Sequence, residues 1–382
     1  MDVAELIRDA DKAVASRDFG RAASLLEEAA LLSPQDMHLW MRVAAMRRGS
    51  GQPAKALEAV HKALAINPRE FTALLMRASL LQKLGDPEAG EAWGHALAQR
   101  PDSTLPEQLG PIIAEAEQRH AAWLDEQDAR MKAAMAAAAE RADSDELRRM
   151  DRFRSNALRR TKPYHSNPTE FYYPELTERE FHPRRLFPWI EQVEAATDAI
   201  TADLRRVMAA ERAELVPYVQ YDEHVPMDQW RKLNKNRDWT AIHLLLRGER
   251  IEANARHCPE TMALLAELPQ PAVRGASPNA MFSLLAPKAV IPPHVGVSNS
   301  RLVCHLPLIV PEGCWFRVGA ETRYWKTGEA FVFDDTIEHE AENPSGELRV
   351  VFIFDVWHPD LSSVERDAVA ALIGSRMRGE SL

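Results

Sequence analysis

The chain has 382 residues, enough for two or three domains that each bury a core. Its formal net charge of −10 predicts no nucleic-acid partner, because phosphate binding requires a basic face. The cysteines Cys258, Cys304 and Cys314 are odd in number and irregularly spaced, which predicts neither a disulfide framework nor a zinc module and is typical of a reducing compartment.

The N-terminal stretch MDVAELIRDADKAV has the pattern of an acidic helix. It lacks the basic start and the apolar centre of a signal peptide. No apolar run in the sequence approaches the roughly 20 residues that are needed to cross a bilayer. We therefore expect a cytoplasmic protein without membrane insertion.

Residues 1–102 contain an internal repeat in which two alanines and a proline recur at nearly constant spacing. The recurring positions are Ala22, Ala29 and Pro34, then Ala56, Ala63 and Pro68, then Ala89, Ala96 and Pro101. Small alanines let the two helices of a hairpin approach closely, and the proline ends the second helix. The region resembles tetratricopeptide repeats. Two roles stay open: a concave groove that binds a peptide or protein, and a scaffold that packs on the domain behind it.

Residues 103–160 are predicted to be a helical linker, because they are rich in strong helix formers. Apolar residues such as Trp123 recur at helical spacing and are expected to form a packing stripe. The arginine-rich run 148–162 is interpreted as a solvated helix face. The Ser, Asn and Pro residues of RSNALRRTKPYHSNPTE then mark a boundary, so a second domain is expected over 161–382.

The pattern changes near Ala280 to short segments rich in β-branched and aromatic residues, separated by turns. These segments are AMFSLLAP, AVIPPHVGV, RLVCHLPLIV, CWFRVGAETRYW, EAFVFDD and LRVVFIFDVW. Many short strands at regular spacing predict an antiparallel sandwich or barrel. With helices before them, we expect a double-stranded β-helix, or jelly-roll fold, with its core over about 280–358. Such a fold has a cavity between its sheets, where side chains of several strands converge.

Alternation along these strands indicates which side chains converge. On RLVCHLPLIV, Arg301, Val303 and His305 share one face, and Cys304 lies on the other. Arg349 lies within the apolar strand LRVVFIFDVW, and a buried cation needs a partner. This arginine is therefore either salt-bridged within the protein or the anchor of an anionic ligand.

His294 in PPHVG and His339 in DDTIEHEAEN are candidate metal ligands. Non-haem Fe(II) sites that activate O2 commonly combine two histidines with a carboxylate and keep open positions for ligands. The position two residues after the first histidine, where the carboxylate would fall, is Gly296. The two histidines alone are compatible with either a structural role or a metal site.

The longer sequence strings resemble the aspartyl/asparaginyl β-hydroxylase family. The resemblance covers about residues 165–362 and is densest from Trp239 onward. Its strings are WTAIHLLLRGERIEANARHCPETMALLAELP, MFSLLAPKAVIPPHVGVSNSRLVCHLPLIVPEGCWFRVG and TRYWKTGEAFVFDDTIEHEAENPSGELRVVFIFDVWHPDL. The resemblance implies an oxygenase that uses Fe(II), 2-oxoglutarate and O2. Some members of this kind also carry tetratricopeptide repeats before the oxygenase domain.

The resemblance also implies roles for single residues. The iron of the family is held by two histidines only, which match His294 and His339, so the missing carboxylate is a family trait. The residues that would bind 2-oxoglutarate match Ser283, His305 and Arg349, with the arginine on the distal carboxylate. An arginine near the substrate matches Arg301.

This chain departs from the family pattern at one inward position. The family commonly has Arg-x-Arg-x-His, whereas Val303 stands at the place of the second arginine. The change removes a cation beside the cosubstrate, and Arg317 on the neighbouring strand is a hypothetical replacement. Asp334 and Asp335 are expected to orient His339 or its loop. Trp325 is expected in the core.

The expected function is hydroxylation of an aspartyl, asparaginyl or similar residue of a peptide or protein, with release of succinate and CO2. The repeats favour such a partner over a free metabolite. A hydroxylase of a small molecule or lipid is the main alternative. A halogenase, with a halide in the space beside Gly296, and a non-catalytic adaptor built on the repeats are further alternatives.

Overall fold

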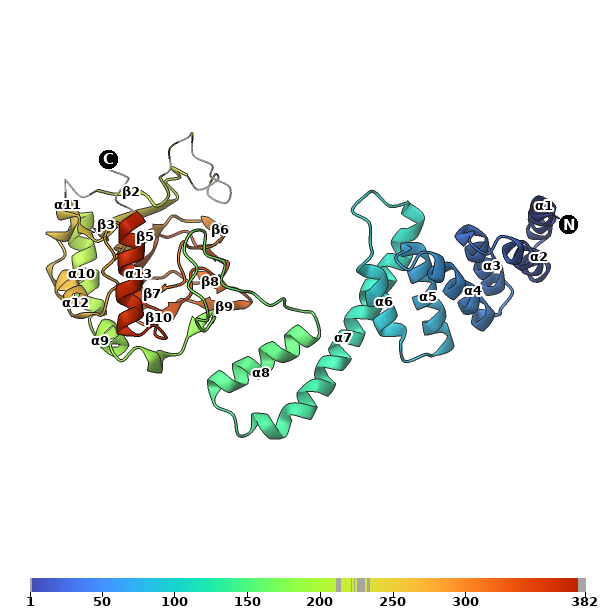
Figure 1. Ribbon diagram of the computed structural model, residues 1–382, viewed down its shortest axis with the longest axis horizontal. Coiled ribbons are helices and arrows are strands. Elements are labelled where there is room, and N and C mark those ends of the chain that lie inside the picture. Colours follow the sequence, from blue (N-terminus) through green and yellow to red (C-terminus); the bar gives the residue numbers. More distant parts are fainter. Residues whose placement is uncertain are drawn as a thin grey trace. The chain divides into compact units, whose positions relative to one another are not determined.

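The chain divides into two compact units, Met1–Arg160 and Thr161–Leu382, and each is described by itself (Figure 1). The computed structural model describes residues 2–210, 214–220, 222, 224, 231 and 234–376. Within these residues, no helix is both long and apolar enough to cross a membrane.

The first unit begins with a row of helical hairpins. Its helices are α1 (Val3–Ala15), α2 (Phe19–Leu32), α3 (Met37–Gly49), α4 (Pro53–Ile66), α5 (Phe71–Leu84) and α6 (Ala89–Leu97). Each helix packs on the next one in sequence. The repeated alanines lie on the second helix of each hairpin and are buried. The predicted helical repeat is therefore confirmed, because these small side chains let the paired backbones approach.

Helix α7 (Gly110–Ala139) continues the array by packing on α6. The side chain of Trp123 lies directly over Gly90, where an added Cβ would come within 2.2 Å of the indole ring. His120 lies in the same way over Gly94, at 2.3 Å. The predicted packing role of Trp123 is correct.

Helix α8 (Ser144–Ala157) has no buried residue. Its Arg154 pairs with Asp128 of α7 and with Asp151, and Arg160 pairs with Asp125 of α7. The arginine-rich run therefore forms a solvated helix face whose charges are met by acidic residues of the neighbouring helix.

The second unit contains two antiparallel sheets. The larger has the strand order β1-β10-β7-β12-β5-β3-β2, with β4 paired to β3, and the smaller has the order β6-β11-β8-β9. The strands are β1 (Phe181–His182), β2 (Val216–Pro217), β3 (Trp239–Leu246), β4 (Glu249–Arg250), β5 (Ala280–Leu285), β6 (Val290–His294), β7 (Arg301–Ile309), β8 (Trp315–Val318), β9 (Glu321–Tyr324), β10 (Phe331–Phe333), β11 (His339–Glu342) and β12 (Arg349–Trp357).

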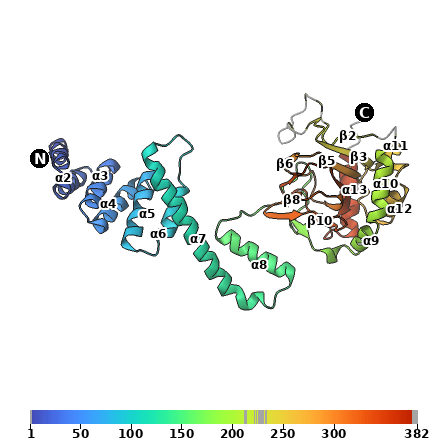
Figure 2. The same cartoon turned by 180° about the vertical axis from the view of Figure 1, so that it is seen from behind.

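The larger sheet is covered on both faces. Phe352 and Phe354 of β12 belong to a core cluster with the helices α10 (Thr197–Met208) and α12 (Pro259–Glu267). The alternate residues Val351 and Ile353 belong to a second cluster with the smaller sheet. In Figure 2, α10 and α12 lie on one side of the strands and β6 and β8 on the other. Short helices α9 (Ile190–Ala195) and α11 (Glu252–Ala255) and the C-terminal α13 (Ser363–Arg376) complete the unit.

The sheet begins earlier in the chain than the predicted core of 280–358. Strand β3, with the sequence WTAIHLLL, pairs along its length with β5 near the middle of the larger sheet. The prediction missed it because apolar residues occupy both of its faces, so the sequence has no clear alternation. The predicted strand segments from Ala280 onward do lie in strands.

Candidate active site

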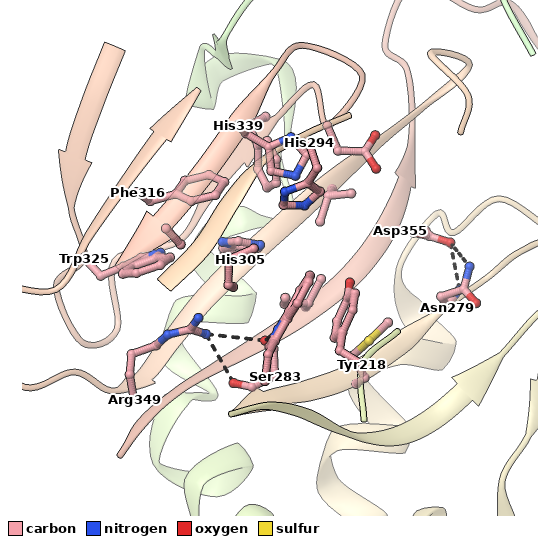
Figure 3. Close-up of a pocket in the computed structure, with 18 of the residues that line it drawn as sticks. Tyr218, Asn279, Ser283, His294, His305, Phe316, Trp325, His339, Arg349 and Asp355 are labelled. Atoms are coloured by element: carbon pink, nitrogen blue, oxygen red, sulfur yellow. Dashed lines mark hydrogen bonds between the residues drawn. The ribbon is translucent and has the colours of Figure 1, made fainter. Parts of the chain in front are cut away.

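A cavity of about 230 Å³ lies between the two sheets and is lined by side chains from most of their central strands. All of the site residues predicted from the sequence line it: Ser283, His294, Arg301, His305, His339 and Arg349 (Figure 3). They come from β5, β6, β7, β11 and β12, so the fold brings together residues that are far apart in sequence.

The two candidate metal ligands lie opposite each other on paired strands. His294 of β6 and His339 of β11 are direct antiparallel partners, and their ring centroids are 4.1 Å apart. Nδ1 of His294 donates to the carbonyl of Pro292 at 2.8 Å, and Nδ1 of His339 donates to the carbonyl of Ile337 at 3.0 Å. A carbonyl only accepts, so each ring carries its proton on Nδ1 and its lone pair on Nε2.

Burial keeps both imidazoles neutral. It is the main cause that lowers the pKa of His294 to about 3, with a further contribution from His339. Burial likewise lowers the pKa of His339 to about 4. Neutral imidazole is the form that binds a metal, and the backbone hydrogen bond to the other ring nitrogen is the usual means of orienting such a ligand. The donor set of the pair therefore fits a divalent transition metal.

The place of the missing carboxylate is filled from a neighbouring loop. An added Cβ at Gly296 would come within 2.2 Å of the Oδ2 atom of Asp335. The space that the halogenase hypothesis requires beside Gly296 is therefore taken by a carboxylate. Among the described residues, no cluster of three or more His, Cys, Asp or Glu side chains could bind a metal.

Asp334 and Asp335 were predicted to orient His339 or its loop, and the structure agrees for Asp334 only. Asp334 accepts hydrogen bonds from the backbone N–H and the hydroxyl of Thr336, and so supports the loop before His339. Asp335 instead lines the cavity, and its Oδ2 accepts a hydrogen bond from Arg301 at 2.9 Å. Its Oδ1 is buried without a hydrogen-bond partner among the described residues.

Arg349 is a buried cation without a carboxylate partner among the described residues. It is 2% exposed, and its guanidinium lies 4.7 Å from the ring centroid of Trp325. Its Nη1 donates to the carbonyl and the hydroxyl of Ser283 at 3.3 and 3.4 Å, and its Nε has no hydrogen-bond partner in the part of the chain that the structure describes. Burial lowers its pKa to about 10, so it stays charged at neutral pH. No internal salt bridge of Arg349, as considered from the sequence, is found among the described residues. Trp325, which was expected in the core, lines the cavity as well.

The surroundings of Arg349 form a mixed polar and aromatic end of the cavity. Ser283 accepts a hydrogen bond from the indole N–H of Trp239 at 3.0 Å. The ring of His305 packs against Phe316 and Phe333, at centroid distances of 5.0 and 4.8 Å, and its Nδ1 has no hydrogen-bond partner among the described residues. Burial and the charge of Arg349 hold the pKa of His305 well below its usual value. This end therefore offers one cation, one neutral imidazole and one hydroxyl to a ligand.

Arg301, expected near the substrate, occupies the opposite end of the cavity. Its Nη2 lies 2.9 Å from Oδ2 of Asp335, and its Nη1 lies 3.6 Å from Oδ1 of Asp355. Burial alone would lower the pKa of this arginine, but the two carboxylates raise it above its usual value. Asp355 was not predicted as a site residue. It lies on the same face of β12 as Arg349, so alternation along this strand could have indicated that its side chain faces the cavity.

Arg317 does not replace the cation that Val303 lacks, so that hypothesis is wrong. Its guanidinium pairs with Glu338 at 3.0 Å and with Glu340. The reason is strand alternation: the adjacent Phe316 lines the cavity, which turns Arg317 to the opposite face of β8.

The aromatic boundary of the cavity was not predicted. Tyr218 stacks on Trp239, with ring centroids 3.8 Å apart and an interplanar angle of 11°. Both side chains line the cavity. Tyr218 follows β2 and Trp239 begins β3, so the two residues are far apart in sequence and no local pattern indicates this contact.

The fold and the cavity together define an enzyme-like β domain, with a pair of neutral histidines and a buried arginine facing one space. Residues 194–359 match the sequence profile described as aspartyl/asparaginyl beta-hydroxylase. This region of the chain is similar to that family, in agreement with the resemblance of its sequence.

Several relatives match part of the chain. The aspartyl/asparaginyl beta-hydroxylase of Homo sapiens is 31% identical over 187 residues, which are 48% of this chain and 24% of that protein. The aspartate beta-hydroxylase domain-containing protein 2 of Xenopus tropicalis is 30% identical over 219 residues, 55% of this chain and 56% of that protein. The ornithine lipid ester-linked acyl 2-hydroxylase of Rhizobium tropici is 32% identical over 190 residues, 49% of this chain and 63% of that protein.

The chain thus spans about a quarter of the length of the human relative. Among solved structures, the TPR domain of Sgt2 from Aspergillus fumigatus is similar to part of this chain, with 19% identity and a TM-score of 0.27 over 31% of this chain and 78% of that one.

Proposed function

We propose that this protein is an Fe(II)- and 2-oxoglutarate-dependent dioxygenase that hydroxylates an aspartyl, asparaginyl or similar residue of a peptide or protein. The observation that carries the proposal is the buried Arg349, which has no carboxylate partner among the described residues and shares one cavity with the neutral pair His294 and His339. A buried cation without a counter-charge destabilises the folded protein unless an anionic ligand pairs with it. We also propose that the two sheets form a double-stranded β-helix and that the protein acts in the cytoplasm.

One set of cavity residues would bind the metal, and another set would bind the cosubstrate. His294 and His339 would hold Fe(II) through their Nε2 atoms, with water completing the coordination. Arg349 would pair with the distal carboxylate of 2-oxoglutarate, and Ser283 and His305 would donate or accept hydrogen bonds on either side of it. The bound iron supplies the activation of O2 that the side chains of this chain lack.

The overall reaction consumes one substrate C–H group, one O2 and one 2-oxoglutarate, and it yields the hydroxylated substrate, succinate and CO2. One oxygen atom enters the product and the other enters succinate. Phe316, Trp325 and Phe333 line the cavity beside the cosubstrate position, and their apolar rings exclude bulk water from it. The protein contributes by positioning the reactants and by placing charged groups beside them.

The repeats of residues 1–102 are proposed to recruit the peptide or protein substrate. Stacked helical hairpins form extended surfaces that suit a peptide. The alternative is a hydroxylase of a lipid or small molecule, which the name of the Rhizobium tropici relative supports. The mass of the product separates the two, because a hydroxylated peptide gains one oxygen on a residue, whereas a hydroxylated lipid gains it on an acyl chain.

The first test is an anaerobic titration of the protein with Fe(II) and 2-oxoglutarate, followed by the visible charge-transfer band of the chelate. We expect a band in the wild-type protein and none in His294→Ala. Arg349→Ala should weaken 2-oxoglutarate binding by at least about 30-fold, because truncating a buried charge pair costs roughly 2–5 kcal/mol.

The matched control is Arg250→Ala, which removes an exposed arginine of the same unit and should leave the band unchanged. A folded protein that shows no band with saturating iron and 2-oxoglutarate would rule out the oxygenase and favour the adaptor hypothesis.

A further inference from the structure

The cavity has two polar ends on the same face of β12. Arg349 and Asp355 are six residues apart on this strand, and at about 3.3 Å per residue their backbones are separated by roughly 20 Å. Figure 3 shows them at opposite sides of the view, with His294 and His339 between them. The proposed function assigns the Arg349 end to 2-oxoglutarate, so the Asp355 end is where a substrate side chain can approach the histidines.

Among the described residues, the Asp355 end carries one cation and two carboxylates. The guanidinium of Arg301 lies 2.9 Å from Asp335 and 3.6 Å from Asp355. Oδ2 of Asp355 also accepts hydrogen bonds from the hydroxyl of Ser277 at 2.7 Å and from both nitrogens of Asn279 at 2.8 Å. The charge of Arg301 is therefore already balanced by two carboxylates, although its Nη1 has no hydrogen-bond partner among the described residues.

The wall between this end and the histidine pair is apolar. Val303 faces the cavity from β7 and is the ladder partner of Asp355 on β12. Ile353 and Met281, which are ladder partners of each other, line the same space. A substrate carboxylate at this position would lose its hydration and meet a net negative charge.

Three polar atoms at this end have no hydrogen-bond partner among the described residues. They are Nη1 of Arg301, which is a donor, Oδ1 of Asp335, which is an acceptor, and Nδ1 of His243, which is either a donor or an acceptor in a neutral ring. A carboxamide has two N–H donors and one carbonyl acceptor, so it can accept from Arg301 and donate to Asp335 and His243. An ionised carboxylate has only acceptors and cannot bond with Asp335.

Building on the proposed function, we propose that the substrate side chain entering the Asp355 end is an uncharged amide, as in asparagine, and not a carboxylate, as in aspartate. The residues that decide this preference are Arg301, with its two carboxylate partners, and the apolar Val303.

The test uses the full chain loaded with Fe(II) and 2-oxoglutarate, and two synthetic peptide libraries. The libraries share randomised flanking positions and differ only in a central asparagine or aspartate. Oxygen incorporation is followed by mass spectrometry, and equilibrium binding of the best peptide and its counterpart is measured anaerobically by calorimetry. We expect turnover and binding of the asparagine peptide to exceed those of the aspartate peptide at least tenfold.

A pair of variants tests the cause of the preference. Val303→Arg adds a cation beside Asp355 and should shift the ratio of aspartate to asparagine turnover at least tenfold towards aspartate. Val303→Met enlarges the same side chain without charge and should keep the asparagine preference. Equal shifts in both variants would show that volume, and not charge, sets the selectivity, which would overturn the electrostatic assignment.

The outcomes separate this inference from the proposed function. Equal or better use of the aspartate library overturns the amide assignment while the oxygenase stands. Reaction with neither library, in protein that shows the charge-transfer band, also overturns the amide assignment alone. Loss of the band itself would overturn the proposed function first.

Discussion

Two buried arginines of one cavity have opposite surroundings. Arg301 is held between Asp335 and Asp355, so its charge is balanced within the protein. Arg349 has an aromatic ring and neutral hydrogen-bond acceptors around it, and no carboxylate among the described residues. A buried cation that is already paired stabilises the architecture of the site, whereas one without a counter-charge is suited to bind an anion.

At the same scale, Gly296 is required for the geometry beside His294. Gly296→Ala would push a methyl group into the carboxylate of Asp335, which is buried and paired with Arg301. We expect a loss of about 1–3 kcal/mol in the free energy of unfolding, as for other overpacked sites, and a weaker chelate band. Urea denaturation and the anaerobic titration measure the two effects.

Gly346→Ala is the matched control, because an added Cβ at this position has no atom within 4 Å. Its free energy of unfolding should stay within about 0.5 kcal/mol of the wild type, as for most surface substitutions. A Gly296→Ala protein as stable as this control would contradict the close packing of Asp335 against residue 296.

At the scale of elements, strand pairing decides which histidines meet. The antiparallel register of β6 and β11 sets His294 directly opposite His339, and both belong to the smaller sheet. The residues proposed to bind the cosubstrate, Ser283, His305 and Arg349, come from the larger sheet. A slip of one residue in either sheet would turn these side chains away from the cavity, so the pairing of the strands is as necessary as the residues themselves.

The contact between α6 and α7 gives a test at this scale. Gly90→Ala would place a methyl group within 2.2 Å of the indole of Trp123, so α7 would have to move away from α6. We expect the first unit to lose about 1–3 kcal/mol of stability, seen as a lower unfolding midpoint by circular dichroism. Gly110→Ala is the control, since its added Cβ meets nothing within 4 Å. Equal midpoints for the two variants would contradict this contact.

At the scale of the whole molecule, each unit has its own core. The hairpin helices bury one set of apolar clusters, and the sheets and their helices bury another. We therefore expect residues 161–382 to fold when expressed alone and to give the same chelate band as the full chain. If the repeats recruit the substrate, the truncated protein should lose peptide turnover while it keeps 2-oxoglutarate binding. A truncated protein with unchanged KM and kcat for the peptide would exclude recruitment by the repeats.

Buried neutral histidines make the stability of the second unit depend on pH. Burial lowers the pKa of His182 to about 3, with a further contribution from His358, and its ring contacts Phe187 and His358. Below its unfolded pKa of about 6.5, this histidine takes up a proton only on unfolding, so stability falls as pH falls from 6.5 towards 3. Each such histidine contributes about 1 kcal/mol of this loss between pH 6.5 and 5.5.

His182→Gln should therefore reduce the fall in unfolding midpoint between pH 7 and 5. Thermal unfolding at a series of pH values measures it, and His165→Gln, which changes an exposed histidine of the same unit, is the control. The prediction fails if both variants keep the pH slope of the wild type.

The sequence by itself determined the helical repeat, the later strands and the residues that line the site. These features follow from local patterns, which can be recognised without knowledge of the fold. The patterns are the periodic alanines, the alternation along strands such as β7 and β12, and the longer strings around His294 and His339. The same patterns missed β3, because a strand that is apolar on both faces lacks alternation.

Only the tertiary structure decided how the charges are paired. Asp335 and Asp355 enclose Arg301, Arg317 faces away from the cavity, and Arg349 has no carboxylate partner among the described residues. These pairings join residues from separate strands and loops, so they depend on register and on which face each strand presents. Electrostatic interactions act through space and not along the chain, and for this reason the charge balance of the site follows from the fold alone.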